Sequence, residues 1–400
     1  MEVEDSVGSR LRNRQLALEF IRRTGGCSRS EIMRELGLSR SGVNHLVSAL
    51  LDEGIIETQT EGPEKPARRG RPSTYLVYRG ESGHVAGLDY GHGHVTVAIA
   101  NLNGEVLAES TARVDVDHDP SGAMEVGKEV FDGLVAQVGG PQIQHVVVGI
   151  PGPIDPRTGL MRVPTVLAEW RGLSPQAEFE RVFGLPVTMS HDAMLGAYGE
   201  STRGAARGLS NVLYIKVSGG VGAAMILNGR PYMGTSGLAG EIGHAPLQGS
   251  TELCRCGNRG CLESVVSADT IRRQLGLSAG REFAADSFDV REVTDAAGVR
   301  ILSEAGWTLG RLLADLCNCL NPQRVVLGGA LGAYSSTFLQ GVEQSIARYA
   351  QPGVIDDLTV VHSQLTDRSE IVGAVMLAAE RAAQLVSLGV ATERAELVLQ

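Results

Sequence analysis

The chain has 400 residues, 43% of them hydrophobic, and a formal net charge of −10 at pH 7. This length and apolar content are typical of a globular protein with two or three domains, each with its own core. Six cysteines, three of them in one cluster, exclude a disulfide framework. The sequence shows neither a signal peptide nor an apolar run long enough to span a bilayer, so we expect a cytoplasmic protein without a membrane partner.

The first part of the chain predicts a small helical head. Three short helices, with a tight turn before the third, are expected within residues 12–54, which describes a helix-turn-helix. Ser28 opens the second helix in a capping box, and Ser39 caps the third. Two strands at 55–58 and 75–78 would then form a winged hairpin. We place this winged helix-turn-helix, with its basic wing and linker, at residues 1–82.

The head also carries the residues expected to bind double-stranded operator DNA. Residues 1–80 hold 13 Lys and Arg against 11 Asp and Glu, although the whole chain is acidic. The predicted contacts are Ser39, Arg40, Ser41, Asn44, His45 and Ser48 on the polar face of the third helix, and Arg68, Arg69 and Arg71 in the wing. Arg is favoured in a narrow minor groove, which suits Gly70-Arg71-Pro72. The alternative is a protein-docking module with a basic linker.

The rest of the chain repeats one plan. Residues 84–100 predict two strands joined by a glycine-rich turn, and Asn103-Gly104 leads to a third strand. Residues 211–227 repeat this pattern, and Asn228-Gly229 forms the corresponding turn. Helices are predicted at roughly 193–203, 264–275, 294–320 and 369–388. A duplicated β-hairpin and helix plan around a cleft is the α/β architecture of actin-like sugar kinases.

A dense set of metal ligands lies between these helices. His244, Cys254, Cys256 and Cys261 follow the spacing His-x9-Cys-x-Cys-x4-Cys. Imidazole and thiolate are preferred zinc ligands, and four protein ligands close a tetrahedral site, so we predict a structural Zn²⁺. Unligated surface residues or a disulfide are the alternatives. A metal here would also fix Glu241 and the nearby Glu263, whose carboxylates suit a polyhydroxyl ligand.

The pattern Cys-x-Cys-Gly-x-x-Gly-Cys-x-Glu at residues 254–263, supported by Gly240-Glu241-x-Gly243-His244, resembles the ROK (repressor, ORF, kinase) family. This family holds xylose and N-acetylglucosamine repressors and bacterial glucokinases. The resemblance extends over residues 12–400. It implies a winged helix-turn-helix followed by a two-lobed, sugar-kinase-like body. We place lobe 1 at residues 83–193 and lobe 2, with the zinc loop, at 194–400, and the C-terminal helix could pack back on lobe 1.

The resemblance also implies a sugar pocket. Asp192 matches the aspartate that takes the proton from the attacking sugar hydroxyl in the kinases, although an Asp here could equally cap a helix. The sugar contacts implied by matching positions are Gly152, Thr165, His191, Asp192, Glu241, His244 and Glu263. His191 stands where the kinases have an Asn. It could replace that Asn as a donor, or it could simply bond backbone at the end of a strand.

Departures from the kinase pattern bear on function. The kinases have Asp-x-Gly-Gly-Thr in the first hairpin, but this chain has Asp89-Tyr-Gly-His92-Gly-His94. The second loop, Gly219-Gly-Val-Gly222, also lacks the kinase Thr. Phosphoryl transfer depends on positioning and charge stabilisation. Without those hydroxyl groups we predict no catalytic activity and expect a sugar-responsive repressor that forms a homodimer or homotetramer. The alternatives are an active sugar kinase with a DNA-binding head, and a regulator controlled by a protein partner.

Overall fold

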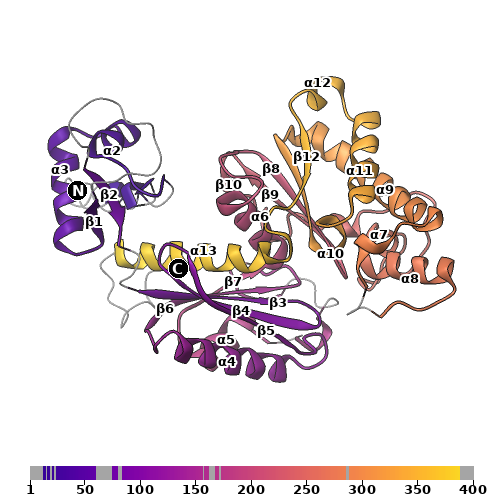
Figure 1. The fold of residues 1–400 in the computed structure, drawn as a ribbon, viewed down its shortest axis with the longest axis horizontal. Coiled ribbons are helices and arrows are strands. Elements are labelled where there is room, and N and C mark those ends of the chain that lie inside the picture. The colour runs from indigo at the N-terminus through magenta and orange to yellow at the C-terminus, as the bar shows by residue number, and fades with distance from the viewer. Residues whose placement is uncertain are drawn as a thin grey trace.

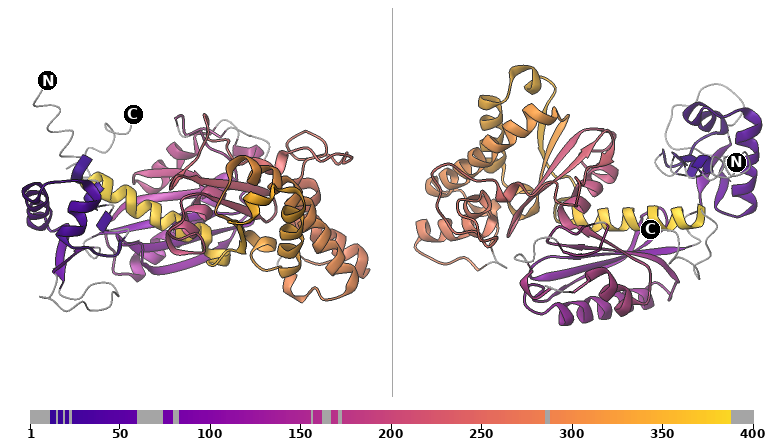
Figure 2. Two further views of the ribbon diagram at one scale, coloured as in Figure 1. Left: turned by 90° about the horizontal axis from the view of Figure 1, so that it is seen from above. Right: turned by 180° about the vertical axis from the view of Figure 1, so that it is seen from behind.

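The structure is a computed structural model of the chain. It describes residues 12–14, 16–18, 20, 21, 24–59, 74–79, 83–155, 157–161, 167–170, 173–284 and 288–387. Four residues predicted to contact ligands, Arg68, Arg69, Arg71 and Thr165, lie outside this part. Figures 1 and 2 show a small N-terminal head and two lobes, each built on its own sheet. None of the described helices combines the length and apolar content that crossing a bilayer requires.

The head is a winged helix-turn-helix, as predicted. The described residues between 12 and 24 are helical. The elements that follow are α2 (Arg29–Leu36), α3 (Arg40–Asp52), β1 (Ile56–Gln59) and β2 (Tyr75–Tyr78). Ser28 forms the predicted capping box with Glu31, and Ser39 Oγ accepts a bond from the Gly42 amide at the start of α3. Strands β1 and β2 pair in antiparallel orientation to form the wing.

The first lobe is built on a sheet with the strand order β5-β4-β3-β6-β7. Its strands are β3 (His84–Tyr90), β4 (His94–Asn101), β5 (Val106–Arg113), β6 (Ile143–Ile150) and β7 (Val187–His191). Strands β3 to β5 are antiparallel, whereas β6 is parallel to β3 and β7 to β6. Helices α4 (Pro120–Gln137) and α5 (Pro175–Phe183) cover one face. Side chains alternate along β3, so Leu88 packs toward those helices and Val85 toward the opposite face.

The second lobe repeats this plan. Its sheet has the order β10-β9-β8-β11-β12, again with three antiparallel strands followed by two parallel ones. These strands are β8 (Val212–Val217), β9 (Val221–Leu227), β10 (Arg230–Pro231), β11 (Arg324–Gly328) and β12 (Thr359–His362). The duplication predicted from the two glycine-cornered hairpins is therefore confirmed.

The second lobe supplies most of the helices. They are α6 (Asp192–Arg203), α7 (Glu263–Val266), α8 (Ala268–Ala279), α9 (Ala296–Leu320), α10 (Gly329–Gly332), α11 (Ser336–Tyr349), α12 (Pro352–Ile355) and α13 (Ser369–Ser387), with short 3₁₀ turns at Ile242–His244, Val290–Glu292 and Thr366–Arg368. A further 3₁₀ turn, Ala168–Trp170, lies in the first lobe. The single helix predicted at 264–275 is wrong. Ser267 lies in the extended region there, ends α7 and caps α8 through the Thr270 amide.

Helices α6 and α13 pack against each other between the two sheets. Their contact is close because it uses glycines: a Cβ on Gly373 would lie 1.9 Å from the Leu195 carbonyl oxygen. Buried Glu200 of α6 also accepts bonds from the Leu365 amide and from Ser369 Oγ, at 2.9 and 2.8 Å. These bonds fix the start of α13 to α6 and so to the second lobe.

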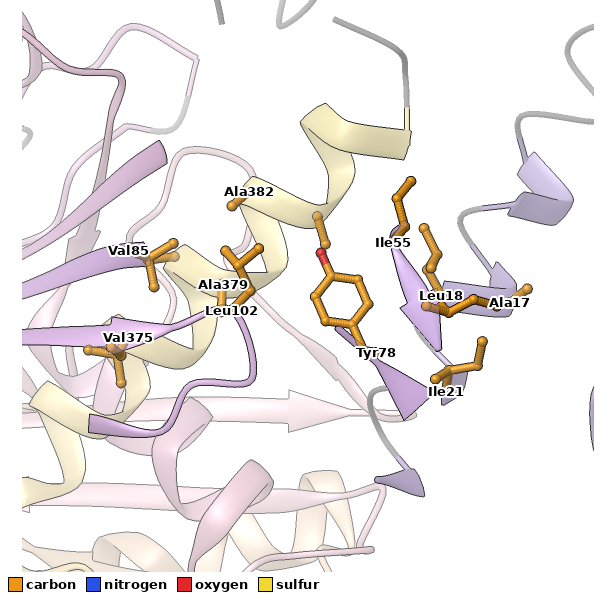
Figure 3. Packing of buried hydrophobic residues seen from close by; sticks show 14 of the residues in the cluster. Ala17, Leu18, Ile21, Ile55, Tyr78, Val85, Leu102, Val375, Ala379 and Ala382 are labelled. Atoms are coloured by element: carbon orange, nitrogen blue, oxygen red, sulfur yellow. The ribbon is translucent and has the colours of Figure 1, made fainter. Parts of the chain in front are cut away.

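The far end of α13 packs on the head. Buried apolar side chains from both parts form one cluster, shown in Figure 3, which includes Leu18, Ile21, Ile55 and Tyr78 of the head and Ala378, Ala379, Ala382 and Ala383 of α13. The same helix also lies on the first sheet. A Cβ added to Gly87 of β3 would be only 2.9 Å from Val375 of α13. The C-terminal helix therefore contacts the head and both lobes.

Candidate functional site

The predicted metal ligands come together in space. The ligand atoms of His244, Cys254, Cys256 and Cys261 all lie within 4.8 Å of one another. His244 Nδ1 is 3.7 Å from Cys254 Sγ, and Cys256 Sγ is 3.7 Å from Cys261 Sγ. In a tetrahedral site with Zn–S bonds of about 2.3 Å, neighbouring ligand atoms lie about 3.8 Å apart. The geometry and chemistry of these donors therefore fit Zn²⁺.

Local backbone structure holds this loop together. Leu253 and Arg259 form a β-bridge across the cysteine loop, and Cys261 forms another with Pro246. Gly260 has φ of 72°, and a Cβ there would lie 2.5 Å from the Ser250 carbonyl oxygen. Glycine is needed at this position because both the left-handed backbone and the close approach exclude a side chain.

Glu241 faces the other predicted sugar contacts. Its Oε2 is 3.7 Å from His244 Nε2, the ring nitrogen remote from the cysteines. Burial raises the pKa of Glu241, His191 and His244 oppose this, and Asp192 and Glu263 raise the pKa further. Four of the other predicted sugar contacts therefore lie near enough to affect the carboxyl group of Glu241.

Glu263 joins the metal loop to the second glycine loop. Its Oε2 accepts a 3.0 Å bond from the Val221 amide, and its Oε1 lies 3.3 Å from Arg255 Nε. Arg255 also donates to the Gly219 carbonyl oxygen at 2.9 Å. Gly220 is close-packed here, since a Cβ on it would lie 2.8 Å from Glu263 Oε2. The side chain is thus held rigidly from both sides.

Asp192 is the first residue of α6 and is not its N-cap, which is His191. Its Oδ1 accepts a 2.6 Å bond from the Ala193 amide and lies 3.2 Å from His191 Nε2. Its Oδ2 accepts a 2.8 Å bond from Lys216 Nζ. Burial alone would raise the pKa of Asp192, but Lys216 and His191 outweigh it and lower the pKa. The interpretation as an N-cap was therefore wrong, although the carboxylate does bond the first turn.

Lys216 and Glu370 lie beside Asp192, and the sequence analysis predicted neither of them. Lys216 Nζ lies 3.3 Å from Glu370 Oε1, which also accepts a 3.1 Å bond from the Tyr214 hydroxyl. Burial raises the pKa of Glu370 to about 7, and that of Asp89 to about 6, although Lys216 lowers both. A lysine inside the otherwise apolar strand β8 was the available signal for Lys216.

Histidines fill the first glycine loop. The His94 ring lies against Gly91, where a Cβ would be 2.2 Å from His94 Cε1, and His94 Nε2 is 4.0 Å from Asp89 Oδ2. Burial lowers the pKa of His94, and Lys216 lowers it further. His92 Nδ1 lies 2.7 Å from an Asp117 oxygen. A Cβ added to Gly219 would lie 3.5 Å from the His92 ring, so the two glycine loops face each other.

Gly152 lies at the same edge of the first sheet as His191. Strands β6 and β7 are parallel, with Ile150 opposite His191, so their carboxyl ends meet there. A Cβ on Gly152 would lie 3.2 Å from Met161 Cε. Ligands of open α/β sheets bind at such edges. The predicted contact Thr165 is outside the described residues.

The predicted DNA contacts of the head share one exposed surface on α3. Val43, Val47 and Leu50 are buried, as expected for the inner face. The predicted contacts Ser39, Arg40, Ser41, Asn44, His45 and Ser48 are all exposed. This face has the polar composition that a recognition helix requires for contacts to bases and phosphates.

Comparison with known proteins agrees with this architecture. The ROK family pattern matches residues 85–381, and a winged helix-turn-helix DNA-binding pattern matches residues 10–57. Because the first match covers more than half of the chain, the protein belongs to the ROK family.

Three relatives illustrate this membership. The xylose repressor of Bacillus spizizenii is 25% identical over 394 residues, which cover 97% of this chain and 100% of the repressor. A glucokinase of Halalkalibacterium halodurans is 29% identical over 309 residues, covering 72% of this chain and 92% of the glucokinase. The crystal structure of a ROK family transcriptional regulator, a homologue of the E. coli protein Mlc, superposes with a TM-score of 0.79 over 95% of this chain and 98% of the regulator. Its identity is 23%, so this likeness establishes the fold alone.

Proposed function

We propose that the protein is a sugar-responsive transcriptional repressor of carbohydrate uptake or catabolism genes, acting in the cytoplasm on double-stranded operator DNA. One observation carries the proposal: a winged helix-turn-helix and a ROK body occupy one chain, and the xylose repressor of Bacillus spizizenii matches this chain over 97% of its length. The glucokinase match covers a smaller share, 72%.

The DNA contacts follow from the exposed face of α3. Asn44 and Arg40 have side chains that can bond adenine and guanine edges in the major groove. Asn44→Ala should relax base specificity and cost roughly 1–3 kcal/mol on the preferred operator. Asp52→Asn, at the other end of α3, is the matched control and should leave specificity unchanged. The basic wing residues Arg68, Arg69 and Arg71 are proposed to contact phosphates and the minor groove.

The body is proposed to bind a sugar without phosphorylating it. Both oxygens of Asp192, the counterpart of the kinase base, already have donors: Lys216 on one, and His191 and the Ala193 amide on the other. A carboxylate whose pKa is lowered by such pairing is a weaker proton acceptor. His94 lies on Gly91, in the loop where the kinases carry Thr.

The proposed sugar contacts are Gly152, Thr165, His191, Asp192, Glu241, His244 and Glu263. Carboxylate oxygens accept hydroxyl donors, and the two glutamates are positioned by the metal loop. Zn²⁺, held by His244, Cys254, Cys256 and Cys261, would supply structural rigidity there. His244 would bind the metal through Nδ1 and present Nε2 toward Glu241.

We infer that α13 transmits sugar binding to the head. Its first turn carries Glu370, which bonds Tyr214 and pairs with Lys216 of β8. Its last turns lie beside the head, within the buried cluster that contains Ala382 of α13 and Tyr78 of the head. At about 1.5 Å per residue, its 19 residues extend roughly 28 Å. A movement between the lobes that shifts α13 would therefore move the head.

The deciding experiment is fluorescence anisotropy of the purified protein on its own upstream DNA, titrated with a panel of sugars at fixed salt. A sugar that shifts the DNA-binding curve supports the proposal. ATP consumption with the same panel tests the kinase alternative, which a sugar-dependent turnover would establish. DNA binding that no sugar changes would instead favour control by a protein partner.

A further inference from the structure

One buried ammonium group joins the starts of two helices. Lys216 lies on β8, which pairs with β9 on one side and with β11 on the other. Its Nζ is 2.8 Å from Oδ2 of Asp192, the first residue of α6, and 3.3 Å from Oε1 of Glu370, in the first turn of α13. The exposed fractions of these three side chains are 16%, 9% and 5%, so water competes little for the two contacts.

The two contacts of the ammonium are unequal. The shorter one has the length of a charge-assisted hydrogen bond, about 2.7–2.9 Å, and the one to Glu370 is longer. Asp89 also attracts Lys216, less than the other two carboxyl groups do. A lysine has three donors on a flexible stem of four carbons, so a small shift of the ammonium can make Glu370 the stronger partner.

Asp192 is also a proposed sugar contact, and the present inference rests on that proposed function. A carboxylate has about four acceptor positions. The Ala193 amide and His191 lie at Oδ1, and Lys216 lies at Oδ2. A sugar hydroxyl that donates to Asp192 would therefore share its negative charge with Lys216. The attraction between Asp192 and the ammonium becomes weaker as a result.

Glu370 is the point at which the first turn of α13 contacts β8. Its Oε1 also accepts a 3.1 Å bond from the hydroxyl of Tyr214, which lies two residues before Lys216 and so on the same face of β8. The other end of α13 belongs to the buried cluster that includes the head. A stronger contact between Lys216 and Glu370 would hold the start of this continuous helix more tightly against β8.

We propose that Lys216 couples the sugar site to α13 by changing its stronger partner from Asp192 to Glu370 when a sugar hydroxyl donates to Asp192. The first turn of α13 is then held more firmly on the second lobe, and the helix transmits this change to the head. Lys216 is thus a positioning residue that acts between the pocket and the helix.

Glu370→Gln tests the exchange of partners. The amide keeps the size of the side chain and can still accept the bond from Tyr214, but it lacks the charge that attracts Lys216, so the ammonium should stay with Asp192. The probes are a panel that includes D-glucose, D-xylose and N-acetyl-D-glucosamine. Calorimetry measures their binding to the full chain, and anisotropy measures the Kd for DNA with and without each of them.

The two proteins should differ in their response and not in sugar binding itself. In the unaltered protein, a sugar that binds should change the Kd for DNA, and couplings between two sites are typically about 5- to 150-fold. In Glu370→Gln the same sugar should still bind, with a Kd of the same order, and should no longer change the Kd for DNA.

Hydrogen exchange provides a second readout that a merely structural role of Glu370 would not change. In the unaltered protein, the sugar should slow amide exchange in the first two turns of α13 by roughly tenfold, which corresponds to about one charge-assisted hydrogen bond. In Glu370→Gln the exchange rate there should be the same with and without sugar.

Tyr214→Phe is the matched control. It removes the other bond to Glu370 Oε1 but leaves Lys216 and both of its carboxylate partners in place. Its DNA binding should respond to sugar as that of the unaltered protein does. Equal loss of the response in Tyr214→Phe would overturn the inference, because the packing around Glu370 would then transmit the signal and the ammonium would not.

A Glu370→Gln variant that responds fully to sugar would also overturn the inference. Both outcomes leave the proposed function intact, because the DNA binding of the unaltered protein still responds to sugar. If no sugar of the panel changes the DNA binding of the unaltered protein, the proposed function fails and the coupling through Lys216 fails with it.

Discussion

Lys216 faces three buried carboxyl groups, Asp89, Asp192 and Glu370, and a single ammonium cannot neutralise all of them. The pKa of Glu370 is raised to about 7 by burial, above its ordinary value of 4.5. An acid with a raised pKa in the folded state contributes stability below its unfolded pKa, and that contribution is lost as pH rises through the folded value. The protein should therefore lose stability between about pH 5 and pH 8.

The substitution Glu370→Gln removes the titrating carboxyl group, and with it the fall in unfolding free energy that Glu370 causes between pH 5 and pH 8. Relative to the unaltered protein, the variant should gain about 2 kcal/mol in unfolding free energy on going from pH 5 to pH 8. Urea denaturation at several pH values measures the difference. Glu129→Gln, at an exposed position on α4, is the control and should parallel the unaltered protein at every pH. A Glu370→Gln variant with the same pH profile would contradict a buried, proton-binding Glu370.

Cys256→Ser tests the metal centre. Removing one of four ligands should abolish stoichiometric zinc binding and loosen the loop that positions Glu241 and Glu263. The response to sugar should be lost while the full chain still binds DNA. Elemental analysis of purified protein gives the zinc content. Cys319→Ser, exposed and outside the cluster, should retain the metal. Unchanged zinc in Cys256→Ser would refute the assigned ligands.

Residues close in sequence were easier to predict than residues brought together by folding. Cys254, Cys256 and Cys261 lie within eight positions, so their spacing alone indicated the metal site. Tyr214 and Glu370 are 156 residues apart, and their bond exists only because α13 returns to the second sheet. Sequence patterns contain no information about such a distant pair unless both partners belong to a known motif.

At the scale of elements, the duplicated sheets were predictable because Asn-Gly turns and alternating apolar residues are local signals. The division between α7 and α8 was not predicted, because the apolar pattern continues through Ser267 while its backbone leaves the helix. The contact of α13 with the head could not be predicted at all. A helix rich in alanine has no distinctive face, and Tyr78, in the same cluster, is about 300 positions earlier.

Ala382→Asp tests the role of α13. Ala382 is 1% exposed within the cluster that joins α13 to the head, so an unpaired carboxylate there should cost a few kcal/mol or separate the two parts. We expect sugar affinity and zinc content to persist, and DNA binding to become independent of sugar. Calorimetry measures sugar affinity, elemental analysis measures zinc content, and anisotropy measures DNA binding. Ala136→Asp, exposed on α4, is the control. A variant whose DNA binding still responds fully to sugar would exclude transmission through this contact.

At the scale of the whole molecule, the head is a small unit at one end of a long body, as Figures 1 and 2 show. A single helix-turn-helix contacts few base pairs, so specificity requires two heads bound together. Oligomer geometry therefore sets which half-site spacings can be bound, and a sugar that moves α13 would change that spacing.

Operator spacing tests this view. Insertion of about 5 base pairs between two half-sites turns one half-site to the opposite side of the duplex, and about 10 base pairs restores its side. With the shorter insertion, affinity should fall toward that of a single half-site, because the two heads can no longer reach both half-sites on one side of the duplex. With the longer insertion, both half-sites face the same side again, and affinity should recover in part. Anisotropy at constant salt measures each operator, and a single half-site is the control. Equal affinity for all spacings would mean that each head binds independently, and sugar would then have to act within one chain.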